Sequence, residues 1–271
     1  MSEKPIPGPL VFAFAEQCDR GTVREENQDN VLHARIPLGA LLIVADGIGG
    51  YSGGATASRM VIAGFQAYLA ALPQDYPADC AIREASARAN ATIVAAASAP
   101  NSPYRRMGST VVLALLQQDA TGTFAWIGHI GDSRAYLVRD GRLNRITSDH
   151  SAVQALLDRN LITPEQALNH PDASVLTRSL GHQPEVEIDL EKLSLMAGDS
   201  LLLCSDGLWG YVSEVEIERA AVNPELTTEA ASRALLDLAL AAGGHDNIGI
   251  EMVRISLPPA DSPWFFKLLR R

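Results

Sequence analysis

The sequence lacks long apolar runs, an excess of basic residues and paired cysteines. No stretch approaches the ~18 consecutive apolar residues of a membrane-spanning helix, and residues 1–5 lack the apolar core of a signal peptide. The net charge of −10 gives no support for nucleic-acid binding. Cys18, Cys80 and Cys204 are an odd number without metal-ligand spacing, which fits a reducing compartment. We therefore expect a cytoplasmic protein with no integral membrane segment and no nucleic-acid partner.

The remaining composition is that of a globular protein. The hydrophobic fraction of 47% and the charged fraction of 20% allow a substantial core. Residues 1–9 contain three prolines and are expected to be a lead-in. We find no internal repeat and no linker that would split the chain, so the 271 residues are expected to fold as one large unit.

Apolar periodicity predicts grouped strands and helices instead of strict alternation. Apolar residues recur at helical spacing over residues 57–72, and a second, alanine-rich helix is expected over residues 78–97. Further helices are expected at 151–159, 164–168, 213–221 and 227–242, and strands at 10–15, 31–36, 41–46, 110–116, 124–130, 134–138, 186–190, 200–204 and 248–255. The Asp140-Gly141 pair indicates a hairpin turn. This grouping favours an α+β fold.

Three of the apolar strands lead into an aspartate. The run 41–45 ends on Asp46 and Gly47, the run 201–204 is followed by Asp206, and residues 124–130 lead to Asp132. The glycines let the backbone approach whatever the aspartates hold. Turn chemistry alone also explains an Asp-Gly pair, but strands far apart in sequence that share this ending favour one acidic site.

Two more aspartates, Asp29 and Asp246, stand next to predicted strands and complete a group of five. Five carboxylates brought together would repel one another unless cations lie between them. Oxygen ligands without a histidine or cysteine cluster favour Mg²⁺ or Mn²⁺ over Zn²⁺. Two such ions can hold a hydroxide for displacement at phosphorus. Arg24 could bind the phosphate through its guanidinium fork, or it could form a surface ion pair with Glu25 or Glu26.

Six short motifs occur in a characteristic order and spacing. They are Arg24-x-x-Asn27-Gln28-Asp29, Asp46-Gly47-x-Gly49-Gly50, Gly108-Ser109-Thr110, Gly131-Asp132-Ser133-Arg134, Ser205-Asp206-Gly207 and Asp246-Asn247. The chain resembles the metal-dependent serine/threonine protein phosphatases of type 2C, in particular the compact bacterial members. The resemblance covers residues 10–256 as the catalytic domain, includes a flap subdomain at about residues 148–182, and leaves an aromatic and basic tail at residues 257–271.

The resemblance implies a central sandwich of two antiparallel β-sheets flanked by pairs of α-helices. It implies hydrolysis of phosphoserine and phosphothreonine in proteins, opposite a serine/threonine kinase, by a monomer that holds two Mn²⁺ or Mg²⁺ ions. Asp46 would bridge both ions, the Gly47 carbonyl would bind one, and Asp206 and Asp246 would hold the other. Asp29 would act directly or through water, and Asp132 would serve a third, weaker ion together with Asp206. Arg24 would bind the substrate phosphate.

The sequence departs from the family pattern at several positions. Gln28 stands where many members have glutamate, which replaces one carboxylate by an amide. Ile48 stands where eukaryotic members place a histidine proposed as general acid, so water would have to protonate the leaving group. Tyr51 and Ala55 replace a histidine and a glutamate common in bacterial relatives, with little effect expected on metal binding.

Other interpretations remain open from the sequence. Cys18 and Arg24 have the cysteine-x₅-arginine spacing of thiol phosphatases. Asp19, Glu25 and Glu26 would raise the pKa of that thiol, whereas a nucleophilic thiol needs a lowered one. A phosphatase fold without activity that serves as a binding module is a second alternative. The tail could dock on a partner or a membrane surface, pack on the domain or be disordered. Cys204 is expected to be a small buried residue.

Overall fold

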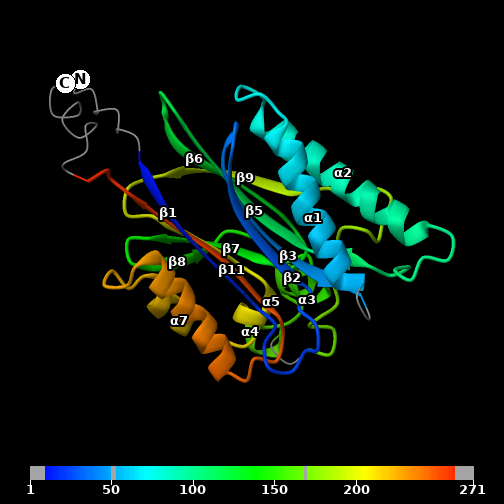
Figure 1. Ribbon diagram of the computed structural model, residues 1–271. Coiled ribbons are helices and arrows are strands. Elements are labelled where there is room, and N and C mark those ends of the chain that lie inside the picture. The colour runs from blue at the N-terminus through cyan, green and yellow to red at the C-terminus, as the bar shows by residue number, and fades with distance from the viewer. Residues whose placement is uncertain (1–9, 50–52, 168–169, 260–271) are drawn as a thin grey trace.

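The computed structural model describes residues 10–49, 53–167 and 170–259, and two antiparallel sheets packed face to face form its centre (Figure 1). One sheet has the order β1-β11-β10-β7-β8 and the other has the order β2-β3-β5-β6-β9, with β4 beside β3. The strands are β1 (Val11–Asp19), β2 (Asp29–Ile36), β3 (Gly39–Ile48), β4 (Gly108–Ser109), β5 (Val111–Asp119), β6 (Gly122–Ile130), β7 (Arg134–Arg139), β8 (Arg142–Arg145), β9 (Asp189–Leu195), β10 (Ser200–Cys204) and β11 (Ile248–Ser256).

Helices cover the outer face of each sheet, on opposite sides of the molecule (Figure 1). The helices are α1 (Gly53–Ala70), α2 (Ala78–Ser98), α3 (Ala152–Asp158), α4 (Pro164–Ala167), α5 (Asp206–Trp209), α6 (Glu214–Ala221) and α7 (Thr228–Ala241). One apolar cluster joins α1 and α2 to β3 and β5, and another joins α5, α6 and α7 to β10 and β11. The predicted α+β sandwich with flanking helices is therefore confirmed.

The continuous apolar run in β3 is explained by burial on both faces. Leu41 and Ile43 pack toward α1 and α2, whereas Leu42 and Val44 pack into the layer between the sheets. Successive side chains of a strand point to opposite faces, so a strand covered on both sides has no position for a polar residue until it reaches the rim. The first polar side chain of β3 is Asp46, which is partly exposed.

The short strands β4 and β8 are additions to the predicted strands, and β9 and α5 also differ from the prediction. The strand expected at residues 186–190 lies later in the chain, as β9. Val186 and Ile188 pack against the apolar cluster that includes α1 and α2, before this edge strand begins. The short helix α5 was not predicted, since its residues follow a strand directly and carry no helical repeat. The hairpin at Asp140-Gly141 is confirmed, with φ of 53° and 71° at the two residues.

Several predictions fall on residues outside the described part of the chain. These are the lead-in at residues 1–9, Tyr51, and the tail from residue 260 onward. Among the described residues, no helix combines the length and the apolar character that crossing a membrane would require.

Candidate metal centre

Asp29 and Asp46 lie side by side on neighbouring strands. Asp29 opens β2 and pairs in register with Asp46 on β3. The Thr110 N–H donates to the Asp46 carbonyl at 2.8 Å, and the Thr110 hydroxyl accepts from the Asp46 N–H at 3.1 Å. The Ser109 hydroxyl donates to the same carbonyl at 2.9 Å. These bonds occupy the main-chain groups of Asp46 and hold its side chain in place at the end of the sheet.

Ser205 connects Asp29 to the opposite sheet. Its hydroxyl donates to Asp29 Oδ2 at 2.6 Å and accepts from the Gly249 N–H at 2.9 Å. The next residue, Asp206, begins α5. A Cβ on Gly207 would lie 1.9 Å from the Asn247 carbonyl oxygen, so only glycine lets α5 pack against the loop before β11. Ser205 belongs to the Ser205-Asp206-Gly207 motif, but its position there does not indicate this role.

Asp246 pairs with Arg24 across the mouth of the site. Arg24 Nη2 lies 2.7 Å from Asp246 Oδ2, so Arg24 pairs across the cleft and not with Glu25 or Glu26, the alternative that the sequence left open. The next residue, Asn247, is buried and accepts from the Gln28 N–H at 2.8 Å. Its side-chain nitrogen donates to the carbonyls of Arg20 and Glu26, at 2.8 and 3.0 Å. Asn247 thus holds the Arg24 loop against the Asp246 loop, a role that its place in the motif did not reveal.

Asp132 follows β6 on a turn that requires glycine. Gly131 has φ +103°, and a Cβ there would lie 2.6 Å from the Thr110 methyl group. The hydroxyls of Thr110 and Ser133 are 2.7 Å apart, so the turn is joined to the residue that fixes Asp46. Asp132 is buried and belongs to the same cleft.

A cleft of about 440 Å³ collects the predicted side chains. It is lined by Arg24, Gln28, Asp46, Gly47, Ile48, Gly49, Thr110, Asp132, Ser174, Leu176, Ser179, His182, Asp206, Asp246 and Asn247. Asp29 does not line this cleft but pairs in register with Asp46, which does. Segments from five parts of the sequence therefore converge as expected. His182 is a cleft residue that the sequence reasoning did not single out, and its Nδ1 lies 2.6 Å from the Ser179 hydroxyl.

Burial and mutual repulsion raise the pKa of the clustered carboxyls. For Asp46, burial is the main cause of a strongly raised pKa, and Asp29, Asp206 and Asp132 add repulsion. Burial likewise comes first in raising the pKa of Asp29, Asp132 and Asp206. Two cations partly oppose this effect: Arg24, which is bonded to Asp246, acts on Asp206, and Arg134 acts on Asp132. Such a cluster is stabilised by protons or by added positive charge.

The donor set fits divalent cations of the hard, oxygen-preferring kind. Asp29 Oδ1 is buried without a hydrogen-bond partner, so it is available to a ligand. A Cβ on Gly54 would lie 2.6 Å from the Gly47 carbonyl oxygen and 2.5 Å from Gln28 Oε1. Glycine at position 54 thus leaves room around both oxygens. Carboxylate, carbonyl and amide oxygens are the ligands that Mg²⁺ and Mn²⁺ prefer.

The alternative thiol nucleophile has the wrong surroundings. Burial and the Asp29 carboxylate raise the pKa of Cys18 to about 11, which leaves the thiol protonated at neutral pH. The cause differs from the expected one, since Asp29 acts more strongly than Asp19. Cys18 Sγ lies 3.3 Å from the Asn27 amide nitrogen and lines no part of the cleft. Cys204 is fully buried in β10, as predicted.

Residues 21–237 match the family model described as protein phosphatase 2C. The chain belongs to the protein phosphatase 2C family. The serine/threonine protein phosphatase PstP of Mycobacterium tuberculosis is 42% identical over 244 residues, which is 89% of this chain and 44% of PstP. The chain thus spans under half the length of that relative. The serine/threonine phosphatase stp of Listeria monocytogenes is 34% identical over 245 residues, 89% of this chain and 95% of stp.

A solved phosphatase 2C structure supports the same assignment. The catalytic domain of PstP, solved in complex with two manganese ions, superposes with a TM-score of 0.79 at 37% identity. The match covers 92% of this chain and all of that domain. The resemblance inferred from the six motifs is therefore confirmed, and so is the sandwich architecture.

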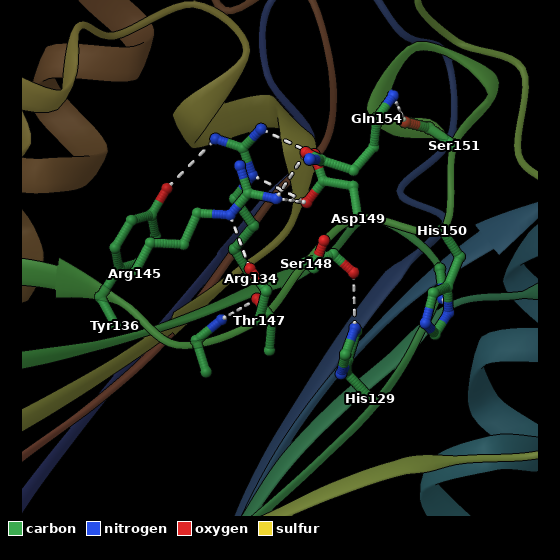
Figure 2. Close-up of polar contacts among 12 residues, drawn as sticks. His129, Arg134, Tyr136, Arg145, Thr147, Ser148, Asp149, His150, Ser151 and Gln154 are labelled. Atoms are coloured by element: carbon green, nitrogen blue, oxygen red, sulfur yellow. Dashed lines mark hydrogen bonds and ion pairs between the residues drawn. The ribbon is translucent and has the colours of Figure 1, made fainter. Parts of the chain in front are cut away.

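In this phosphatase 2C chain a charged network anchors the start of the predicted flap, residues 148–182 (Figure 2). Asp149 accepts from Arg134 at 2.7 and 3.0 Å and from Arg145 at 2.7 Å. The Arg134 guanidinium also lies over the Trp209 ring, 3.4 Å from its centroid. Since Arg134 follows the Asp132 turn and Trp209 ends α5, this network links two segments of the metal centre to the segment that follows β8.

Proposed function

We propose that this protein is a metal-dependent protein serine/threonine phosphatase that hydrolyses phosphoserine and phosphothreonine in proteins. The observation that carries the proposal is the convergence of Asp46, Asp132, Asp206 and Asp246 on one cleft, with Asp29 paired to Asp46 beside it and Arg24 at its mouth. Family membership supports the reaction class, as do the names of the relatives, which are serine/threonine phosphatases.

We propose two Mn²⁺ or Mg²⁺ ions as the cofactors, with a third, weaker ion. Asp46 would hold both ions, the Gly47 carbonyl one of them, and Asp206 and Asp246 the other. Asp132 and Asp206 would hold the third ion. The manganese-bound PstP domain and the all-oxygen donor set support this choice. When bound, the ions supply a hydroxide nucleophile at neutral pH and neutralise charge that develops on the phosphoryl group.

The chain's own residues orient the substrate and the carboxylates. Arg24 is 54% exposed and uses one nitrogen for Asp246, which leaves further N–H groups for phosphate oxygens. Asp29 is held by Ser205 and lies beside Asp46 on the neighbouring strand. Ile48 offers no proton at the cleft, and we propose that water protonates the leaving alkoxide.

Further assignments follow from the proposed reaction. The substrates would be phosphorylated proteins, and a serine/threonine kinase would act in the opposite direction. The three free cysteines, Cys18, Cys80 and Cys204, support a reducing, cytoplasmic location. We propose a monomer.

Hydrolysis of a phosphothreonine peptide in the presence of Mn²⁺ tests the proposal. Asp46→Asn and Asp206→Asn should each remove nearly all turnover, because each removes a carboxylate from the proposed ligand set. The matched control is Asp237→Asn, an exposed aspartate on α7 that pairs with Arg233, and it should retain wild-type turnover. A chelator should abolish activity and Cys18→Ser should not. The reverse pattern would favour the thiol mechanism, and folded protein without any hydrolysis would favour a binding module.

A further inference from the structure

Three ionisable side chains lie where the layer between the sheets reaches the edge strands β1 and β2, away from the metal centre. Phe12 and Phe14 on β1, Val31 on β2, and Val253 and Ile255 on β11 all pack into this layer. Side chains two residues apart on a strand share a face. Glu16, His33 and Glu251 therefore face the same layer, on β1, β2 and β11.

Glu251 is the unusual member of this trio. Its side chain is 0% exposed, and neither carboxyl oxygen makes a hydrogen bond. Burial raises the pKa of Glu251 to about 10, and the Glu16 carboxylate adds repulsion. Buried ionisable groups are ordinarily paired and hydrogen-bonded. This carboxyl group is thus directed into the trio, where His33 Nδ1 lies 3.3 Å from its Oε2 and no hydrogen bond of good geometry holds it.

The three ligand atoms have the spacing of a metal coordination sphere. His33 Nδ1 lies 3.1 Å from Glu16 Oε2 and 3.3 Å from Glu251 Oε2, and ligand atoms of all three lie within 4.8 Å of one another. At metal–ligand distances of about 2.0–2.1 Å, two ligands of a tetrahedral ion are about 3.3 Å apart. The His33 ring stacks on Phe14, with centroids 5.4 Å apart and planes 11° apart, which fixes the direction of Nδ1.

A second trio, His129, His150 and Asp189, shows the contrast. His150 Nδ1 accepts from the Gly131 N–H at 3.1 Å, and its Nε2 lies 3.1 Å from Asp189. His129 Nε2 lies 2.8 Å from the Ser148 carbonyl (Figure 2). Protein groups already satisfy these nitrogens, so this trio is a hydrogen-bonded anchor. His33 Nδ1 faces the two carboxylates of its trio at 3.1 and 3.3 Å, but forms no hydrogen bond of good geometry.

We propose that Glu16, His33 and Glu251 bind a divalent transition-metal ion of the Zn²⁺ type, separate from the metal centre. One imidazole and two carboxylates match the three protein ligands of many zinc sites, with water as the fourth ligand. Glu16 is 51% exposed, which gives that water access. The imidazole selects against Mg²⁺. Because Glu16 and Glu251 are cross-strand partners in one sheet and His33 belongs to the other, the ion would clamp the two sheets together.

Calorimetric titration of the full chain with ZnCl₂ tests this site. The background carries Asp46→Asn and Asp206→Asn, so that the metal centre contributes little. We expect one equivalent of Zn²⁺ to bind, with affinity reduced at least tenfold by Glu251→Gln and by His33→Gln. Glu191→Gln, an exposed glutamate on β9, is the matched control and should bind as the background does. Zn²⁺ binding that is absent, or unchanged in both variants, would overturn the proposal.

A second measurement separates loss of the site from loss of the fold. Glu251→Gln removes a buried ionisable group, so the metal-free variant should melt no lower than its parent. In otherwise wild-type protein, the same substitution should leave Mn²⁺-dependent hydrolysis unchanged. Crystals soaked in ZnCl₂ should show anomalous density between His33, Glu16 and Glu251. If a saturating soak gave no anomalous density between these side chains, a proton alone would neutralise Glu251 and the proposal would be wrong.

Discussion

Single side chains that hydrogen-bond to the carboxylates affect how tightly the metal centre binds its ions. Ser205 bonds Asp29 on one sheet and Gly249 on the other, so its hydroxyl fixes one carboxylate across the sandwich. Groups that orient metal ligands typically contribute 10–100-fold in affinity. We predict that Ser205→Ala weakens activation by Mn²⁺ about tenfold, measured as the Mn²⁺ concentration at half-maximal hydrolysis. Ser194→Ala on β9 is the control, and equal behaviour of the two variants would count against the role of Ser205.

Arg24 differs from the carboxylates because it is exposed and would contact the substrate. Its loss removes a phosphate contact that forms on binding, so Arg24→Ala should raise KM more than it lowers kcat. Steady-state kinetics with a phosphothreonine peptide measures both, and Arg35→Ala on β2 serves as control. A variant with unchanged KM and a collapsed kcat would place Arg24 in the chemical step instead.

At the scale of elements, the sequence predicted most strands and helices because their apolar periodicity was strong. The Asp46 strand is such a case, since its run of buried residues has core on both sides. The later part of β9 was missed because an edge strand with Glu191 and Lys192 has a weak pattern. The roles of Ser205 and Asn247 were missed because they depend on bonds between segments some 200 residues apart. Local sequence carries no signal for those bonds.

The network at Asp149 gives a prediction about the segment that follows β8. Asp149 and Arg134 have side chains that are 7% and 12% exposed, and Arg145 shares the same carboxylate. Removing one partner of a buried ion pair leaves the other uncompensated, at a cost of about 3 kcal/mol. Asp149→Ala should therefore lower the free energy of unfolding by about that amount in urea denaturation. Asp158→Ala at the exposed end of α3 should change the free energy of unfolding little. Similar free energies for both variants would show that the Asp149 network does not stabilise the fold.

At the scale of the whole molecule, the clustered carboxyls make metal-free stability depend on pH. Folding raises the pKa of Asp206 from 3.8 to about 6, of Asp29 to about 7 and of Asp132 to about 8. A carboxyl with a raised pKa binds its proton more tightly when folded. Its contribution to stability is therefore complete below pH 4, near the pKa of the unfolded chain. The contribution is lost as the pH rises through the pKa of the folded protein.

We accordingly predict that chelated protein loses stability between pH 5 and pH 8, and that Asp132→Asn reduces this slope because asparagine does not ionise. Melting temperatures at several pH values measure the effect. At pH 8, Mn²⁺ should raise the melting temperature, since a ligand at 100 times its Kd adds about 2.7 kcal/mol. Chelated protein that is more stable at pH 8 than at pH 5, with the same slope in Asp132→Asn, would contradict the electrostatic description of the site.

The most direct measurement is an anomalous difference map from crystals soaked in MnCl₂ and recorded at the manganese edge. Two peaks should lie in the cleft, one against Asp46 and Gly47 and one against Asp46, Asp206 and Asp246. A saturated crystal whose cleft shows no manganese, or whose ions lie away from Asp46, would contradict the account.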